Sequence, residues 1–331
     1  MKIFLSMPEG HVTDTFFTER TWAMVREFGE ITQNPYGRYM TIDELTELAK
    51  DCEILITGWG TPCIDKAAAE KMPNLKLIAH TAGSVAALVT PEIYDMGIQV
   101  IGGNDVFAKS VAEGALCYTL CALRRIEHYV NVVRTGGWRD AEFQNRGLFG
   151  KKVGIVGFGT ISKHFLNLIR WYGNEVLIYS SHLSDEEAAV YGGRTAGLEE
   201  IFSTCDVISI HSSMTPKTKG LVTRELLASM KKDALLVNTA RGPVIDEVAL
   251  FQFLHEGRFF AALDVYEEEP LLPDNPIRQC ENAFLMPHMG GPTIDMREVV
   301  VMELCKDFAR YQKGEPMLNV IDCAAAKRMT R

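Results

Sequence analysis

The sequence lacks the features that mark secreted, membrane-spanning or fibrous proteins. Its eight cysteines form no Cys-x-x-Cys pair and are scattered along the chain, as expected for reduced thiols in the cytosol rather than for a disulfide framework. The apolar stretch at the N-terminus ends at Pro8 and Glu9, which is too early for a signal peptide. No uninterrupted apolar segment approaches the roughly 18 residues of a membrane span. These absences predict a soluble, cytoplasmic protein without a membrane partner.

Runs of like charge, low-complexity segments and short-period repeats are also missing. The 34 basic and 43 acidic residues give a net charge of −9. This acidic balance disfavours a nucleic-acid partner but leaves room for a local anion site. At about 150 residues per domain, the 331 residues suggest two domains.

A metal site is not predicted. Cys117 and Cys121 are four residues apart on a predicted helix, a spacing that could bring two ligands together. No histidine or second cysteine pair joins them, so the favoured interpretation is packing in an apolar environment.

Short apolar runs rich in β-branched residues alternate with longer amphipathic stretches, a pattern typical of parallel sheets flanked by helices. The segment that begins at Val111 and ends at Arg124-Arg125 is apolar on nearly every face and predicts a helix buried between two domains or two subunits. A final helix is expected over residues 293–311. The expected strands of the first part are residues 2–5, 54–57, 75–79 and 98–100. Those after Gly150 are residues 153–156, 176–179, 207–210, 235–237, 261–265 and 283–286, the number of strands in a complete Rossmann domain.

A glycine-rich turn follows the strand over residues 153–156. Gly157 and Gly159 match the first two glycines of Gly-x-Gly-x-x-Gly, while Ser162 replaces the third. The first glycine permits a tight turn and the second lets the backbone approach a pyrophosphate, whereas the third mainly allows close packing, which a serine hinders little. The helix that starts at Thr160 would offer free N–H groups to phosphates. The alternative is a glycine turn without a ligand, but the strand before it and the helix after it favour dinucleotide binding.

The end of the next strand bears on the choice of nicotinamide cofactor. NAD-binding domains place a carboxylate there for the ribose hydroxyls, but this chain has Ser180 and Ser181, followed by His182. Without that carboxylate a 2′-phosphate is not repelled, and the hydroxyls could bind it. No arginine is present at this point, so NADP(H) is favoured only slightly over NAD(H).

Three residues with acid, base or carboxylate-binding chemistry follow later strands. Ligands of open parallel sheets bind beyond the carboxyl ends of the strands, where Arg241, Glu269 and His288 are expected. Arginine can hold a carboxylate through two parallel hydrogen bonds. Histidine exchanges protons near neutrality, and a neighbouring glutamate would orient its ring and favour the charged form. Each residue has a structural alternative (a strand-end cap, a solvated acid, a loop histidine), but together they favour a catalytic site.

Several ordered motifs give the chain a resemblance to the D-isomer-specific 2-hydroxyacid dehydrogenase family over nearly its whole length. They are Ser110-Val111-Ala112-Glu113, the segment from Gly150 to Gly157, Asn238-Thr239-Ala240-Arg241-Gly242, Ala262-Leu263-Asp264-Val265 with Glu269-Pro270, and Pro287-His288-Met289-Gly290-Gly291.

The resemblance implies two doubly wound parallel-sheet α/β domains. A Rossmann NAD(P)-binding domain over residues 104–295 would be inserted into a flavodoxin-like substrate domain formed by residues 1–103 and 296–331. It also implies an NAD(P)-dependent oxidoreductase that interconverts a small D-2-hydroxy acid and its 2-oxo acid, as a homodimer.

The resemblance further implies roles for individual residues. Arg241 would bind and orient the substrate, His288 would act as the acid in reduction and the base in oxidation, and Glu269 would be its partner. The backbone of Ala82, Gly83 and Ser84 would bind the substrate carboxylate. The residues expected to contact the cofactor are Gly157, Gly159, Thr160, Ile161, Ser180, Ser181, Ser212, Thr239, Ala240, Asp264 and Gly290.

The chain departs from the usual family pattern at Ser162, Ser180 and Ser213, and the loop after Gly83 lacks the Asp that often follows there. These departures bear on the choice of cofactor and substrate. Two alternatives stay open. Some relatives are NAD(H)-responsive corepressors, and others are phosphoglycerate dehydrogenases, whose substrate needs cations that Arg38, Lys109 or Arg139 could supply.

Overall fold

The computed structural model describes residues 1–139 and 145–330, which divide into two compact units. The first unit consists of Met1–Ala108 and Pro292–Arg331, and the second of Lys109–Gly291. The boundaries expected from the sequence, after residues 103 and 295, fall within a few residues of these. The first unit is therefore discontinuous in sequence.

The first unit contains a five-stranded parallel sheet with the order β2-β1-β3-β4-β5. This is the flavodoxin-like order of doubly wound folds. Its strands are β1 (Lys2–Leu5), β2 (Glu30–Gln33), β3 (Ile54–Thr57), β4 (Leu77–His80) and β5 (Gln99–Gly102).

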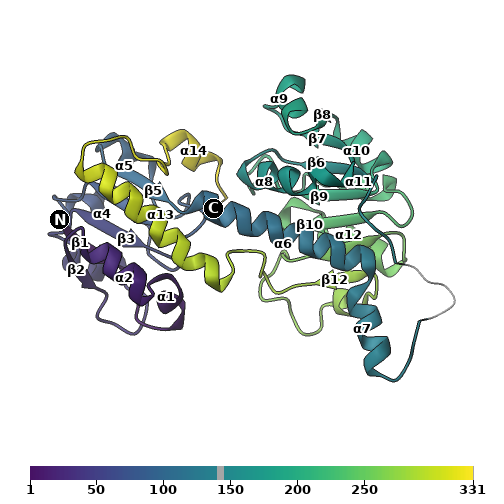
Figure 1. The fold of residues 1–331 in the computed structure, drawn as a ribbon, viewed down its shortest axis with the longest axis horizontal. Coiled ribbons are helices and arrows are strands. Elements are labelled where there is room, and N and C mark those ends of the chain that lie inside the picture. The colour runs from purple at the N-terminus through teal and green to yellow at the C-terminus, as the bar shows by residue number, and fades with distance from the viewer. Residues whose placement is uncertain (140–144, 331) are drawn as a thin grey trace. The chain divides into compact units, whose positions relative to one another are not determined.

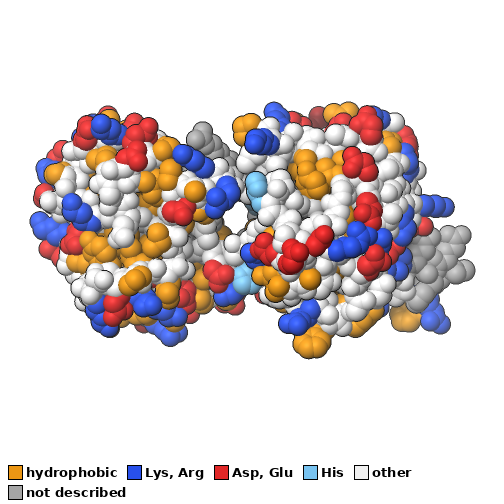
Figure 2. Space-filling view, turned by 90° about the horizontal axis from the view of Figure 1, so that it is seen from above, with side chains coloured by type: hydrophobic (Ala, Val, Ile, Leu, Met, Phe, Trp, Pro, Cys, Tyr) orange, Lys and Arg blue, Asp and Glu red, His pale blue; other side chains and the backbone are white. Residues whose placement is uncertain are grey.

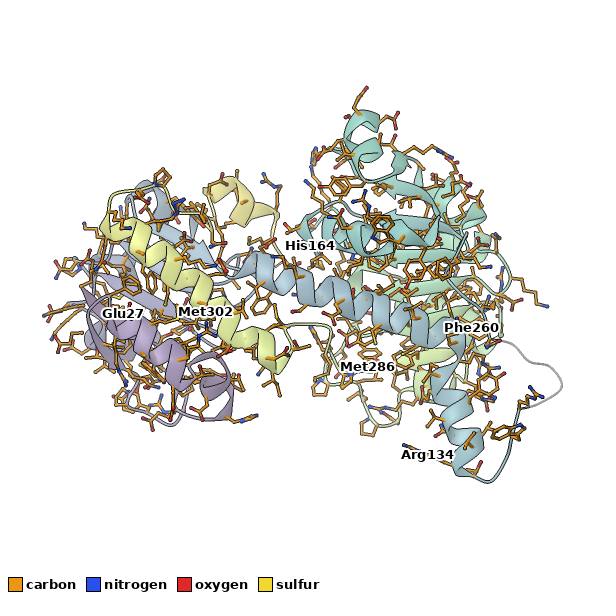
Figure 3. All side chains as sticks on the ribbon, in the orientation of Figure 1. Glu27, Arg134, His164, Phe260, Met286 and Met302 are labelled. Carbon is orange, nitrogen blue, oxygen red and sulfur yellow. The ribbon has the colours of Figure 1, made fainter. Side chains whose placement is uncertain are left out.

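Helices cover both faces of this sheet (Figure 1). Successive strand residues point to opposite faces, so Ile3 and Leu5 join one hydrophobic cluster while Phe4 joins the other. The first cluster includes Phe16, Val25 and Phe308 from the helices α1 (His11–Phe16), α2 (Glu19–Arg26) and α13 (Ile294–Gln312). Figure 3 labels Met302 on α13 and Glu27 just beyond α2. The second cluster is covered by α3 (Ile42–Leu48), α4 (Lys66–Glu70), α5 (Pro91–Asp95) and α14 (Cys323–Arg328).

The second unit contains a seven-stranded parallel sheet with the order β12-β11-β10-β9-β6-β7-β8. Counted from β6, this is the Rossmann order 3-2-1-4-5-6 with one further strand at the edge. Its strands are β6 (Lys152–Val156), β7 (Glu175–Tyr179), β8 (Gly193–Thr195), β9 (Val207–Ile210), β10 (Leu235–Asn238), β11 (Phe260–Leu263) and β12 (Ala283–Leu285). The prediction of two doubly wound parallel-sheet domains is confirmed.

Apart from a long helix described below, one helix of the second unit precedes β6 and the others lie between later strands. They are α7 (Ile126–Arg134), α8 (Thr160–Ile169), α9 (Asp185–Val190), α10 (Leu198–Thr204), α11 (Arg224–Ser229) and α12 (Glu247–His255), with the short 3-10 turns η1 (Arg170–Tyr172), η2 (Gly242–Val244) and η3 (Pro276–Gln279). Side chains of both charge signs are interspersed over the visible face of each unit (Figure 2), in keeping with the lack of like-charge runs in the sequence.

Two strands were not predicted, and both lie at sheet edges. The strand β2 reads Glu-Ile-Thr-Gln and β8 reads Gly-Arg-Thr, and neither contains a buried residue. An edge strand pairs on one side only, so its side chains can be polar and give no continuous apolar run. Sequence patterning therefore detected the central strands and the apolar edge strands β5 and β12, and it missed these two polar edge strands.

The long helix α6 (Asn104–Arg124) begins in the first unit and continues into the second. By length and composition it could span a membrane, contrary to the expectation that no segment could, but 56% of its most apolar window is buried inside the structure. We interpret it as a core helix. It is not buried on all faces, because Glu113, Cys117 and Arg124 are exposed. The expectation that Cys117 packs in a core is therefore wrong, since it lies on this exposed stripe.

The eight cysteines are free thiols, of which Cys52, Cys205 and Cys305 are buried. Within residues 1–139 and 145–330, no group of three or more His, Cys, Asp or Glu side chains is placed to hold a metal ion.

Candidate active site

The turn after β6 has the geometry that a dinucleotide requires. Gly157 has a φ of +100°, and a Cβ atom built there would lie 2.7 Å from the backbone nitrogen of Ser212, so no side chain fits. A Cβ at Gly159 would meet nothing within 4 Å, which leaves open space where this backbone faces outward. The N–H of Gly157 donates to the carbonyl of Tyr179 at 2.9 Å and brings the end of β7 beside the turn.

Ser162 fits the position of the third glycine. It is fully buried, and its hydroxyl accepts a hydrogen bond from the N–H of Gly159 at 2.7 Å and donates to the carbonyl of Gly159 at 3.0 Å. The serine thus closes the turn with its own hydroxyl. The N–H groups of Thr160 and Ile161 belong to the first turn of α8, where an α-helix offers unpaired donors and the positive end of its dipole.

The remaining predicted cofactor residues of this turn region lie at the carboxyl ends of neighbouring strands. Ser180 is half-buried and Ser181 exposed, just after β7. The Ser212 hydroxyl donates to the carbonyl of Val156 at 3.1 Å, and the Ala240 N–H donates to Oδ1 of Asn238 at 3.0 Å. The Thr239 hydroxyl is buried and has no hydrogen-bond partner among the described residues, as a group reserved for a ligand would. These residues fit a nicotinamide dinucleotide.

Glu269 and His288 form a hydrogen-bonded pair in the second unit. Nδ1 of His288 lies 2.6 Å from Oε2 of Glu269, and Oε1 of Glu269 accepts the Tyr266 N–H at 3.0 Å. An ionised carboxylate only accepts hydrogen bonds, so Nδ1 carries the proton and Nε2 is the atom that can exchange a proton with a ligand. The His288 side chain is 46% exposed, which leaves this ring accessible.

Arg241 follows β10 and lies close enough to Glu269 to interact with its charge. Burial lowers the pKa of Arg241, and the Glu269 carboxylate opposes this shift. One guanidinium nitrogen, Nη1, donates to the carbonyl of Ala240 at 2.6 Å. The next residue, Gly242, packs so tightly that a Cβ atom would lie 2.0 Å from the backbone carbonyl carbon of Tyr266. This backbone contact brings the loop of Arg241 against the loop that carries Glu269.

Asp264, expected to contact the cofactor, organises the loop that carries His288. Its buried carboxylate accepts the N–H groups of Met289 and Gly290 at 2.7 Å each, while its backbone carbonyl accepts the His288 N–H at 2.9 Å. Burial raises the pKa of Asp264, and these hydrogen bonds work against that shift. His288 has a φ of +56°, a conformation that is unfavourable for a residue with a side chain, so the loop must be held in place.

Gly290 is fixed by the same carboxylate. A Cβ atom there would lie 2.7 Å from Oδ2 of Asp264. Glycine is therefore needed for packing against Asp264, whatever further contact it makes with a cofactor.

The predicted substrate loop follows β4 in the first unit. Ala82 is buried, and Gly83 and Ser84 are half-buried. The Ser84 hydroxyl donates to the carbonyl of Thr330 at 2.5 Å and accepts the N–H of Ala86 at 3.3 Å. The side chain is thus engaged within the first unit, and the backbone of the loop is the part left for a ligand.

Of the cations considered for a phosphorylated substrate, Arg38 is already engaged. Its guanidinium makes two hydrogen bonds to the Glu44 carboxylate, at 2.9 and 2.6 Å, and this pairing raises the pKa of Arg38. Lys109 is the first residue of the second unit and Arg139 is exposed beside the end of the described segment.

Sequence reasoning missed Tyr266. Its backbone N–H holds Glu269, and its buried hydroxyl donates to the carbonyls of Leu263 and Met286 at 3.3 and 3.1 Å, which ties the ends of β11 and β12 together. The Glu269 contact uses the backbone, so the residue type gave no signal. A tyrosine directly after an apolar strand was the only available indication.

Comparisons with known proteins agree with this geometry. Residues 116–290 match the family profile described as D-isomer specific 2-hydroxyacid dehydrogenase, NAD binding domain. The chain is 30% identical to the glyoxylate reductase of Korarchaeum cryptofilum, over 86% of either chain. It is 32% identical to the D-3-phosphoglycerate dehydrogenase of Methanocaldococcus jannaschii over 90% of its own length, but it spans only 56% of that relative. Among solved structures, the TT0316 protein from Thermus thermophilus matches with a TM-score of 0.77 and 26% identity, covering 97% of this chain and all of the other.

Proposed function

The chain belongs to the D-isomer-specific 2-hydroxyacid dehydrogenase family, and we propose that it reduces a small 2-oxo acid to the D-2-hydroxy acid with NAD(P)H, and catalyses the reverse oxidation. The observation that carries the proposal is the pair of Glu269 and His288, 2.6 Å apart, with Arg241 in the adjoining loop. A cation for the carboxylate and a group that gives and takes a proton are what this reaction requires of the protein.

Arg241, His288 and Glu269 have different roles in the proposed reaction. Arg241 holds the carboxylate of the substrate and stabilises the negative charge that develops on the carbonyl oxygen. His288 gives a proton from Nε2 to that oxygen during reduction and removes it during oxidation. Glu269 holds the proton on Nδ1, so the ring always presents Nε2 to the substrate. The nicotinamide cofactor, when bound, supplies or accepts the hydride.

The chain's own residues support the cofactor assignment. The backbone of Gly157 and Gly159 and the first turn of α8 would bind the pyrophosphate, and Ser212, Thr239, Ala240 and Asp264 would line the rest of the cofactor. We propose that NADP(H) is slightly preferred, because Ser180 and Ser181 place no carboxylate beside the adenine-side ribose.

The substrate is proposed to be a small, unphosphorylated 2-oxo acid such as glyoxylate or hydroxypyruvate. Ala82, Gly83 and Ser84 of the first unit would bind its carboxylate through their backbone. The pairing of Arg38 with Glu44 removes one of the cations that a phosphorylated substrate would need. The relative named glyoxylate reductase, which this chain matches over most of both lengths, supports the same choice.

We further propose that the protein acts in the cytoplasm as a homodimer. The helix α7 supports a second copy as partner, because it buries none of its residues and exposes Ile126, Val130 and Val133 by 40% or more.

Initial-rate measurements test the proposal. Glyoxylate, hydroxypyruvate, pyruvate and branched 2-oxo acids are each offered with NADPH and with NADH, and the configuration of the product is determined on a chiral column. We expect turnover of the smaller acids to the D product. If the protein binds NAD(P)H but reduces none of these acids, the proposal is contradicted and the corepressor alternative is favoured. Formation of the L product also contradicts the proposal.

A further inference from the structure

The segment 315–330, here named the C-terminal strap, returns from α13 to the first sheet. The buried carboxylate of Asp307 accepts the N–H groups of Leu318 and Asn319 at 2.6 and 3.0 Å. The strap then pairs with β5, where the Ile321 N–H donates to the carbonyl of Val100 at 2.8 Å and the Gly102 N–H donates to that of Asn319 at 3.2 Å. These contacts fix the beginning of the strap to the edge strand of the sheet.

Beyond this anchor the strap packs beside the predicted substrate loop. Ile321 and Ala326 are buried in the same hydrophobic cluster as Val85 and Leu88, the residues that follow Ser84. Met329 packs against that cluster, and its sulfur accepts a hydrogen bond from the side chain of Asn104 at 3.7 Å. The strap therefore shares its core with the stretch of chain that supports the loop.

The loop itself is held from two sides. The Ser84 hydroxyl donates to the carbonyl of Thr330 in the strap at 2.5 Å. On the other side lies the buried His80, which bonds to the backbone of Ser84 and whose Nδ1 lies 2.9 Å from the Thr57 hydroxyl. A loop held between β4 and the strap has little freedom to rearrange.

We propose that the C-terminal strap positions the substrate loop, with Ser84 and Thr330 as the pair that joins them. In this role the Ser84 hydroxyl binds the strap, and only the Ser84 backbone is directed toward the substrate. The inference rests on the proposed function for the identity of the ligand, a 2-oxo acid carboxylate bound by backbone N–H groups of residues 82–84.

A physical reason links the strap to substrate binding. A loop that is free before binding must lose conformational entropy when the substrate binds, and this loss weakens the affinity. A loop that is already held binds without that cost. Release of the strap should therefore raise KM, while the chemistry at His288 and Arg241, and hence kcat, stays nearly unchanged.

Two variants of the full enzyme test the proposal, Ser84→Ala and a deletion of residues 329–331. We expect each to raise KM for the best 2-oxo acid about three- to tenfold, to leave kcat within about twofold, and to leave the Kd of NADPH, from fluorescence titration, unchanged. Because the deletion already removes Thr330, the partner of the Ser84 hydroxyl, the double variant should show little more than the effect of the deletion alone. The matched control is Ser203→Ala, which removes a similar hydrogen bond, 2.6 Å from a hydroxyl to the carbonyl of Glu199, on α10 of the second unit.

Hydrogen exchange provides a readout that does not depend on turnover. The amides of Ala86, Leu88 and Val89 should exchange faster in both test variants and at the wild-type rate in the control. An unchanged KM, equal losses in kcat and kcat/KM, or multiplying effects in the double variant overturn the proposal. If the wild type reduces no 2-oxo acid, the proposed function fails, and the exchange rates still decide the strap: unchanged rates overturn it and faster rates support it.

Discussion

Nδ1 of His288 lies 2.6 Å from Oε2 of Glu269, and this contact couples the loops that follow the successive strands β11 and β12. The loop of His288 is also held by Asp264, and the loop of Glu269 by Tyr266. Backbone hydrogen bonds therefore hold the pair in place. The roles of the pair, of Arg241 and of these supporting contacts can be tested separately.

Removal of the proton donor should change the pH profile. In His288→Ala, we expect kcat/KM for reduction to fall by at least a thousandfold and to lose the limb that proton donation produces. Glu269→Gln should lower kcat by about 10- to 100-fold with little change in KM, because the ring loses its orientation. A residual limb of unchanged position in His288→Ala would assign the proton to another group.

The substrate cation should be irreplaceable by a neutral side chain. For Arg241→Gln we expect kcat/KM to fall at least a hundredfold, from both a higher KM and a lower kcat, because the guanidinium binds the carboxylate and stabilises the developing charge. Arg241→Lys should recover only part of this loss, since an ammonium cannot make two parallel hydrogen bonds. Steady-state kinetics at saturating NADPH measures both, and wild-type turnover in Arg241→Gln would refute the role.

Gly290 and Gly291 are adjacent in the chain, but only Gly290 is packed tightly against a neighbouring side chain. At Gly290 a methyl group would lie 2.7 Å from Oδ2 of Asp264, whereas at Gly291 it would meet nothing within 4 Å. We expect Gly290→Ala to lower the free energy of unfolding by about 1–3 kcal/mol and to reduce activity, and Gly291→Ala to leave both near wild type. Urea unfolding and initial rates measure the difference, and equal effects at the two positions would contradict it.

Cofactor choice should respond to one carboxylate. In Ser180→Asp the new charge repels a 2′-phosphate and accepts hydrogen bonds from ribose hydroxyls. We expect the ratio of kcat/KM with NADPH to that with NADH to fall at least tenfold, with Ser203→Asp on the surface of α10 as the charge control. A tenfold preference of the wild type for NADH would contradict the proposed NADP(H) preference.

Acid should destabilise the fold through two buried histidines. Burial lowers the pKa of His80 and of His211 to about 4 each. Between about pH 6.5 and pH 4 the unfolded chain binds more protons than the folded one, so stability falls as the pH falls, by up to about 1.4 kcal/mol per pH unit for each histidine. Urea unfolding at pH 7, 6 and 5 should show this slope, and His211→Gln should reduce it. A free energy of unfolding that does not change between pH 7 and pH 5 would contradict the lowered pKa values of both histidines.

The sequence predicted the strands that lie inside the sheets, because strands buried on both faces are continuous apolar runs, and it also predicted the edge strands β5 and β12, which are apolar as well. The edge strands β2 and β8 carry no such run and were not found. The proximity of Arg241, Glu269 and His288 could be predicted because the carboxyl ends of parallel strands share one edge of a sheet, and a motif at each strand end is visible in the chain.

Contacts through the backbone, or between distant segments, could not be predicted. Tyr266 holds Glu269 with an N–H group that every residue except proline possesses. Ser84 and Thr330 are 246 positions apart, and neither has a pattern that points to the other. The exposure of Cys117 depended on which stripe of an almost wholly apolar helix faces solvent, and the composition of α6 does not define that stripe.

The discontinuity of the first unit has a consequence for synthesis on the ribosome. Its five strands emerge early, but α13, which buries one face of their sheet with Val300, Leu304 and Phe308, follows the entire second unit. The face that contains Ile3 and Leu5 therefore waits for a helix translated about 200 residues later, some tens of seconds at typical elongation rates of ~5–20 residues per second. The second unit, which is continuous, can therefore complete its core before the first, although translation begins with the first unit.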